Sequence, residues 1–277
     1  MKNVVVRALS GAVYVALIVG AIFLGKEAFA ALCLLFILLS VAEATRLFGA
    51  GRKQDLLCNA IDIAGGISIF CGLTAPFIFS PEEVSSLPVF AGAIPFTLYL
   101  LVRLTVELFL GRENPIANMG ASLLSVMYTA FPLSLMFILY CFGGRYAVLA
   151  MFIFIWLNDT GAFCVGSMIG KHKLFPRVSP NKSWEGVWGG LAFCIIAGVL
   201  FTTLGAEYFG DNIIRYVIFG ITASVLSTIG DLVESLFKRT AGVKDSGNLM
   251  PGHGGILDRI DSLLFVAPAT LVLLFVY

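Results

Sequence analysis

The sequence predicts an all-α fold, namely a polytopic integral membrane protein with about nine transmembrane helices. Of its 277 residues, 59% are hydrophobic and only 13% are charged, and the mean hydropathy is +0.96. A soluble domain carries about a quarter charged residues, so this composition indicates a protein embedded in a membrane. The apolar residues also occur in runs of about 20, the length that crosses a bilayer as a helix.

Nine such runs follow one another along the chain. They lie near residues 8–24, 28–48, 60–79, 87–110, 118–142, 145–169, 185–207, 212–237 and 256–277. The first run is longer than the apolar core of a signal peptide and a second follows directly, so we expect it to be retained as a helix. Pro132 in the fifth run predicts a kink or a division there. Eight or ten crossings therefore also agree with the pattern.

The lysines and arginines predict the topology. With the N-terminus placed in the cytoplasm, most of the 18 cations fall at cytoplasmic ends of the runs, and only Lys26, Arg145 and Arg215 fall on the opposite side. Arg103 lies inside the fourth run. Because cytoplasmic loops carry an excess of Lys and Arg, we expect the two longest polar loops, 170–184 and 238–255, in the cytoplasm. The expected location is the plasma or inner membrane.

The remaining composition excludes several kinds of site. The six cysteines lie mostly within apolar runs, where Cys behaves as a small hydrophobe. His172 and His253 are the two histidines, too few for a multi-histidine metal site. The formal net charge of +1 says little about partners, and we expect no nucleic acid among them.

The polar residues are distributed unevenly between two halves of one membrane domain, 1–277. Residues 1–144 form apolar runs joined by short loops, whereas residues 145–277 hold both long loops and most of the intramembrane polar residues. No internal repeat of the kind found in secondary transporters is visible. We therefore expect the first half to be mainly scaffold and the second half to carry the catalytic helices and loops.

Three charged residues share one face of the eighth run near its cytoplasmic end. Asp231, Glu234 and Lys238 are spaced i, i+3 and i+7. An ionised carboxylate left in hydrocarbon costs about 2.5–3.5 kcal/mol. Lys238 and the neighbouring Arg239 can extend to the interface, but the Asp231 side chain is too short to do so. We therefore interpret Asp231 as functional.

The ninth run begins with a second charged group, formed by Asp258, Arg259 and Asp261. The two aspartates are i, i+3 neighbours at a helix N-terminus, where anions are favoured. They form either a capping arrangement or, with Asp231, an oxygen-rich pocket. Carboxylates without cysteine or histidine ligands suit Mg²⁺ better than zinc.

A glycine-rich loop connects the two charged groups. It contains Lys244, Asp245 and the segment 251–255, Pro-Gly-His-Gly-Gly. Backbone N–H groups of such a loop can approach phosphate oxygens, and the loop leads into a helix N-terminus. An ordinary tight turn has a similar composition, but the flanking cations and aspartates favour a phosphate-and-metal site.

A second polar segment lies upstream. Asn158 and Asp159 fall inside the sixth run and form either a polar pair satisfied by a neighbouring helix or a functional group. The segment 179–183, Ser-Pro-Asn-Lys-Ser, followed by Glu185, combines a turn, a cation, hydroxyl groups and a helix-capping pair. Such groups can bind a nucleotide phosphate or a ribose. The spacing of Gly166 and Gly170, repeated at Gly186 and Gly190, predicts close helix packing.

Together these segments resemble the signature of the phosphatidate cytidylyltransferases, the CDP-diacylglycerol synthases. The matching stretches are Asn158-Asp159-Thr160-Gly161-Ala162-Phe163, Gly170-Lys171, 179–186, and 235–261 with its Pro-Gly-His-Gly-Gly turn. They occur in the family's order within the second half of the chain. The first half adds only a matching hydropathy pattern.

The resemblance implies that CTP and phosphatidic acid are converted to CDP-diacylglycerol and pyrophosphate in phospholipid biosynthesis. It implies a catalytic group and a substrate-binding group of residues. The catalytic group is Asp231, Asp258, Asp261, Lys238, Asp245 and His253; the substrate-binding group is Ser179, Asn181, Lys182, Glu185, Arg239, Lys244, Arg259, Asn158 and Asp159. Within them, Asp231, Asp258 and Asp261 would bind Mg²⁺, with a second cation also compatible.

By the same resemblance, the cations of the second loop would hold the phosphates of CTP and of the lipid, while Asp245 and His253 would orient the loop or assist proton movement. The partners would be these substrates and membrane lipids, and a homodimer is compatible. Two alternatives stay open. A CTP-dependent polyprenol kinase would share a phosphate-and-metal site but transfer the γ-phosphate to an alcohol. A secondary transporter would show repeat symmetry and charges at the midplane.

Overall fold

The computed structural model describes the chain except residues 1, 50–55, 79–89, 251, 253 and 277. Its described part contains nine helices and two short strands, and the helices confirm the all-α prediction. The helices are α1 (Lys2–Leu24), α2 (Lys26–Phe48), α3 (Leu56–Ile78), α5 (Phe90–Leu110), α6 (Pro115–Ile169), α7 (Trp184–Thr203), α8 (Ala206–Phe209), α9 (Ile213–Thr240) and α10 (Leu257–Val276). Within the described residues, eight of them are long and apolar enough to cross a membrane. The protein is a multi-pass membrane protein.

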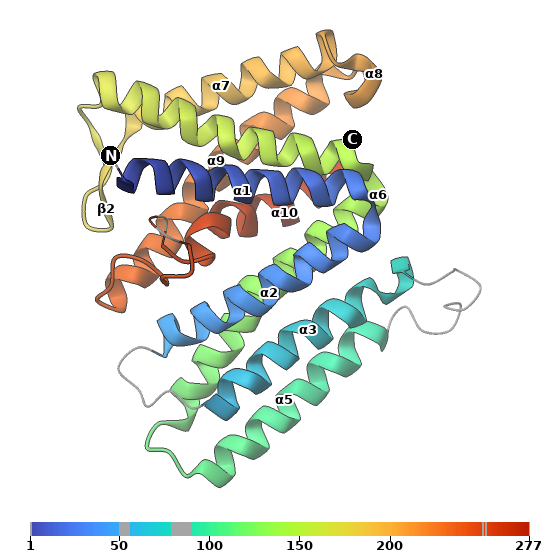
Figure 1. Ribbon diagram of the computed structural model, residues 1–277, viewed down its shortest axis with the longest axis vertical. Coiled ribbons are helices and arrows are strands. Elements are labelled where there is room, and N and C mark those ends of the chain that lie inside the picture. The colour runs from blue at the N-terminus through green and yellow to red at the C-terminus, as the bar shows by residue number, and fades with distance from the viewer. Residues whose placement is uncertain (1, 50–55, 79–89, 251, 253, 277) are drawn as a thin grey trace.

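Helix α6 accounts for two of the predicted runs. It has 55 residues, and at 1.5 Å per residue its length is more than twice the roughly 30 Å thickness of the hydrocarbon core. The chain turns at Gly144, whose φ of 70° and ψ of −179° are not helical and suit a residue without a Cβ. Figure 1 shows the change of direction within α6. The fifth and sixth runs are therefore separate segments, divided at Gly144 and not at Pro132, which lies inside the helix.

The loop before α7 departs from the all-helical fold. Strands β1 (Lys173–Phe175) and β2 (Ser179–Ser183) form an antiparallel hairpin in which Lys173 pairs with Ser183. The predicted turn at 179–183 is thus a strand. The helix cap predicted in this segment is confirmed, because the Ser183 hydroxyl accepts a hydrogen bond from the Gly186 N–H at the start of α7.

Glycines bring α6 and α7 close together, as their spacing predicts. A Cβ at Gly186 would lie 2.9 Å from the Ala162 carbonyl oxygen and 3.5 Å from the Gly166 Cα. Larger side chains at this crossing would push the helices apart. This packing fixes where the hairpin lies relative to α6.

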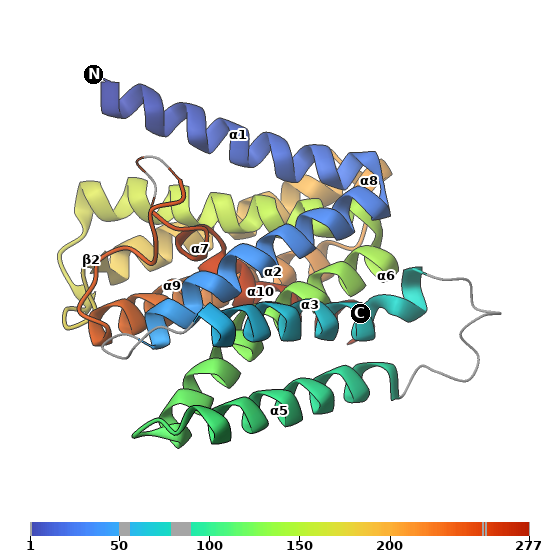
Figure 2. The same ribbon diagram turned by 60° about the horizontal axis from the view of Figure 1, so that its bottom comes forward.

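The termini of the elements collect at two ends of the bundle. The start of α1, strand β2 and the C-terminal end of α9 lie at the left of Figure 1, whereas α8 and the chain's C-terminus lie at the right. Figure 2 shows α1 along one side of the bundle and α5 along the opposite side. The segments with the predicted site residues therefore meet at one end.

A buried ion network joins α3, α5 and α6. Arg103, which is 1% exposed, donates from Nη1 to Glu107 Oε2 at 2.8 Å and from Nε to the Ser122 hydroxyl at 3.1 Å. Its Nε also lies 3.4 Å from Asp62 Oδ1. These acceptors and carboxylates compensate the charge that the sequence places inside the fourth run.

Candidate active site

The charged face predicted on α9 forms a buried ion cluster with α10. Lys238 Nζ donates to Glu234 Oε2 at 2.5 Å and to Asp258 Oδ1 at 2.6 Å. The three side chains are 11%, 1% and 5% exposed, respectively. Glu234 Oε1 is buried without a hydrogen-bond partner among the described residues. Two carboxyl groups therefore share one ammonium group.

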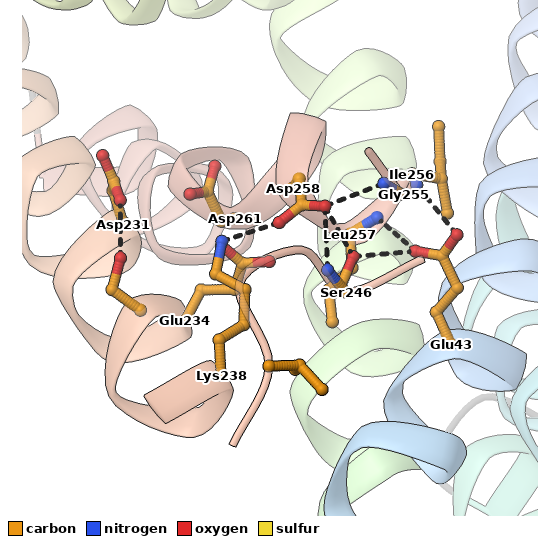
Figure 3. A network of polar contacts seen from close by, with 12 residues as sticks. Glu43, Asp231, Glu234, Lys238, Ser246, Gly255, Ile256, Leu257, Asp258 and Asp261 are labelled. Carbon is orange, nitrogen blue, oxygen red and sulfur yellow. Dashed lines mark hydrogen bonds and ion pairs between the residues drawn. The ribbon is translucent and has the colours of Figure 1, made fainter. Parts of the chain in front are cut away.

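Asp258 also organises the glycine-rich loop. Its Oδ2 accepts from the Ser246 N–H at 3.0 Å, the Ser246 hydroxyl at 3.0 Å and the Gly255 N–H at 2.8 Å (Figure 3). The glycines of this loop predict N–H groups that are available to phosphate. In the structure two N–H groups of the loop, those of Ser246 and Gly255, donate to a protein carboxylate.

Glu43 of α2, which is not among the predicted site residues, lies on the other side of the same loop (Figure 3). Its carboxylate accepts from the Ile256 N–H at 3.0 Å and the Leu257 N–H at 2.9 Å, and lies 3.1 Å from the Ser246 hydroxyl. The signal was present, because Glu43 is an ionisable residue within an apolar run, and such residues are functional candidates by default.

The hairpin reaches α9 through an ion pair. Lys182 Nζ lies 2.6 Å from Asp231 Oδ2, and Asp231 Oδ1 accepts from the Ser235 hydroxyl at 3.2 Å. The two side chains are 27% and 36% exposed. The structure thus brings together a residue predicted to bind nucleotide and a residue predicted to bind metal.

Two predicted substrate-binding residues hold the hairpin in place. Glu185 accepts from the N–H groups of Lys171 and His172, each at 3.2 Å, and lies 2.6 Å from His172 Nδ1. Arg239 Nε donates to the Val178 carbonyl at 3.3 Å. Ser179 and Asn181 lie on β2 nearby, half-buried and exposed, respectively.

A cavity of about 290 Å³ lies beside the ion cluster. Its apolar wall includes Val15, Phe152, Ile155, Trp156 and Leu263, and its polar wall includes Asp159, Asp258, Arg259 and Asp261. Helix α1 closes one side with Gly11 and Tyr14, and the Tyr14 hydroxyl donates to the Arg259 carbonyl at 3.0 Å. The cavity can therefore accept a molecule with one charged and one apolar part.

The carboxylates near the cavity lie close enough for their charges to interact. Asp159, Asp231 and Asp261 interact pairwise through space. Asp261 is 9% exposed, and its Oδ1 accepts from the Ser262 N–H at 2.7 Å. In the part of the chain that the structure describes, however, no three acidic, histidine or cysteine side chains converge as a ready metal-binding group.

The remaining predicted residues are Asn158, Lys244, Asp245 and His253. Asn158 is 2% exposed, and its Oδ1 accepts from the Ser224 hydroxyl of α9 at 2.7 Å. Asn158 therefore joins α6 to α9, which is the first of the two alternatives given for it above, a polar residue satisfied by a neighbouring helix. Lys244 and Asp245 are exposed on the loop. His253 lies outside the described residues.

Comparison with known proteins identifies the family. Residues 5–277 match the cytidylyltransferase family. The chain belongs to this family. The relationship covers the α1 and α2 segments as well as the signature segments, so the helices that contribute Tyr14 and Glu43 are part of the family domain.

Individual cytidylyltransferases are also similar in sequence. The chain is 51% identical over 134 residues to a phosphatidate cytidylyltransferase of Staphylococcus aureus (strain COL), covering 47% of this chain and 50% of that protein. It is 46% identical over 129 residues to one of Haemophilus influenzae, covering 46% and 45%. Both alignments span about half the length of those relatives. A phosphatidate cytidylyltransferase of Staphylococcus haemolyticus is 37% identical over 228 residues, which cover 80% of this chain and 84% of that protein.

Proposed function

We propose that this member of the cytidylyltransferase family transfers the cytidylyl group of CTP to phosphatidic acid, forming CDP-diacylglycerol and pyrophosphate. The observation that supports this most directly is the cavity beside the Lys238 cluster, which has a charged wall and an apolar wall. A phospholipid phosphate with its acyl chains has the same two parts. The relatives named above are phosphatidate cytidylyltransferases.

In the proposed reaction an oxygen of the lipid phosphate attacks the α-phosphorus of CTP. A new bond forms between the lipid oxygen and the α-phosphorus. The bond from the α-phosphorus to the oxygen that bridges it to the β-phosphorus breaks, and its electron pair leaves with pyrophosphate. Two polyanions must approach each other, so the protein contributes mainly positioning and charge screening. We assign this screening to Lys182, Lys238, Arg239, Lys244 and Arg259, with Ser179 and Asn181 beside the nucleotide.

We also propose that Asp231, Asp258 and Asp261 hold Mg²⁺, with Asp159 close to them. The donor set fits, because hard divalent cations prefer carboxylate oxygens. The ammonium groups of Lys182 and Lys238 lie against Asp231 and Asp258, which indicates that both places favour a positive charge. Asp258 would exchange its contact with Lys238 Nζ for the ion. Bound Mg²⁺ would neutralise phosphate charge.

The domain and membrane assignments belong to the same proposal. One membrane domain spans the chain, and residues 145–277 supply most of the site. Residues 1–144 are more than scaffold, since Glu43 and Tyr14 contact the α10 segment. We place the site on the cytoplasmic side of the plasma or inner membrane, where the cations of the loops gather. A homodimer is compatible with this arrangement.

A labelling experiment tests the function. Purified protein in detergent–phosphatidic acid micelles receives CTP labelled at either the α- or the γ-phosphate. The proposal predicts α-label in the lipid product and γ-label in released pyrophosphate. The reverse pattern, with γ-label in the lipid and CDP released, would establish a lipid kinase instead. No lipid labelling from either nucleotide, in protein that is folded and supplied with Mg²⁺, would refute the proposed transfer.

A further inference from the structure

Glu43 caps the N-terminus of a helix to which it is not adjacent in sequence. It lies on α2. It accepts hydrogen bonds from the N–H groups of Ile256 and Leu257, which are 213 and 214 residues away. The first N–H groups of a helix have no partner within the helix, and the positive end of the helix dipole attracts an anion. The Glu43 carboxylate accepts hydrogen bonds from these N–H groups and places a carboxylate at the positive end of the α10 dipole.

The glycine-rich loop is shaped to admit this carboxylate. A Cβ at Gly247 would lie 2.5 Å from Glu43 Oε1, and a Cβ at Gly255 would overlap Glu43 Oε2. Glu43 itself is only 7% exposed. The two glycines therefore let the loop close over a buried charge that is satisfied by hydrogen bonds on both oxygens.

Ser246 connects Glu43 to the ion cluster. Its hydroxyl lies 3.1 Å from Glu43 Oε2 and 3.0 Å from Asp258 Oδ2, so it donates to one carboxylate at a time. Asp258 in turn contacts Lys238 Nζ at 2.6 Å. A continuous set of contacts thus runs from α2 through the loop to α9.

We propose that Glu43 is a positioning residue for the active site. By holding the first N–H groups of α10, it fixes the rotation and depth of the turn that carries Asp258, Arg259 and Asp261. The role in turnover depends on the function proposed above, whereas the clamp on α10 does not. Misplacement of reacting groups by about 1 Å can reduce a rate by about 100-fold. Of the cations proposed to contact the substrate phosphates, Lys182 and Arg239 lie outside this turn, on β2 and on α9.

The test compares Glu43→Gln with Glu43→Asp and with a matched control, Glu27→Gln. Glu27 lies at the other end of α2 and is exposed, so its substitution changes the same charge on the same helix. Hydrogen–deuterium exchange is measured without substrates on peptides covering residues 246–260 and on a peptide from α7. Turnover is measured separately with CTP and phosphatidic acid, as kcat and as KM for CTP.

We expect Glu43→Gln to raise exchange of the Ile256 and Leu257 amides about tenfold or more while the α7 peptide keeps its protection, since a neutral amide is a weaker acceptor than a carboxylate. We expect kcat to fall by about tenfold to 100-fold with KM for CTP within about threefold of the original. Glu43→Asp, which keeps the charge, should give intermediate values, and Glu27→Gln should change neither.

Unchanged exchange of the 246–260 peptides in Glu43→Gln would refute the clamp. Increased exchange throughout the protein would also refute it, because Glu43 would then act on overall stability. Local exchange that rises without a loss of kcat would refute the positioning role. If the unmodified protein makes no CDP-lipid, the function proposed above fails, and the exchange of the Ile256 and Leu257 amides still decides whether Glu43 holds α10.

Discussion

Lys182 Nζ lies 2.6 Å from Asp231 Oδ2, so a residue of the hairpin and a residue of α9 form one ion pair at the candidate active site. The two residues come from the two polar segments that the sequence singled out separately. The contact places the hairpin over the end of α9. It also means that substitution of either residue leaves the other without its ionic partner.

The first prediction concerns Lys182. Lys182→Met should lower kcat/KM for CTP about tenfold to 100-fold, because one charge-assisted hydrogen bond contributes about 1.5–3 kcal/mol. Steady-state kinetics at several CTP concentrations measures the change. Lys26→Met is the control, since Lys26 is an exposed cation at the other end of the bundle. Equal kinetics for both variants would show that Lys182 does not act on the nucleotide.

The second prediction concerns metal. EDTA should abolish turnover and added Mg²⁺ should restore it, because oxygen-only ligands favour a hard divalent cation. Asp231→Asn and Asp261→Asn should each abolish turnover while the protein remains inserted and folded. Asp211→Asn, an exposed aspartate before α9, should keep full activity. Normal turnover in excess chelator would contradict the metal proposal.

The third prediction concerns the Arg103 network. Arg103→Ala leaves the buried carboxylates of Asp62 and Glu107 without their principal cation, so the free energy of unfolding should fall by about 3–5 kcal/mol. Reversible unfolding in detergent measures the loss. None of these three residues lines the cavity, so the folded fraction should keep its activity.

The matched control for Arg103 is Arg145→Ala. Arg145 is exposed, with its guanidinium 5.9 Å from the Phe23 ring centre, and an exposed cation–π contact contributes only about 0.5–1 kcal/mol. Similar losses of stability for the two variants would indicate that the Arg103 network has no special role.

The fourth prediction concerns orientation. In a background without the six native cysteines, single cysteines at Asn181 and Asp245 should react with a membrane-impermeant reagent from the cytoplasmic side only. Both positions are exposed, on the hairpin and on the glycine-rich loop. A cysteine at Asp211 should react only from the opposite side. Reaction of Asn181 and Asp245 from opposite sides would mean that the two loops cannot form one site.

Local patterns in the sequence were sufficient for the helices and for much of the site. Runs of apolar residues predicted the eight long helices, including the two segments of α6, because helix length and hydropathy are local properties. The i, i+3, i+7 spacing likewise predicted that Asp231, Glu234 and Lys238 share one face of α9, and Lys238 does contact Glu234. The glycine spacing predicted the close crossing of α6 and α7.

Contacts between distant segments were decided only by the tertiary structure. No local pattern indicates that Glu43 caps α10 or that Arg103 meets Asp62. The physical reason is that a hydrogen-bonding group has several suitable partners of the same chemical type along the chain. Which one it binds depends on how the helices pack, and therefore on contacts between residues as far apart as Glu43 and Leu257.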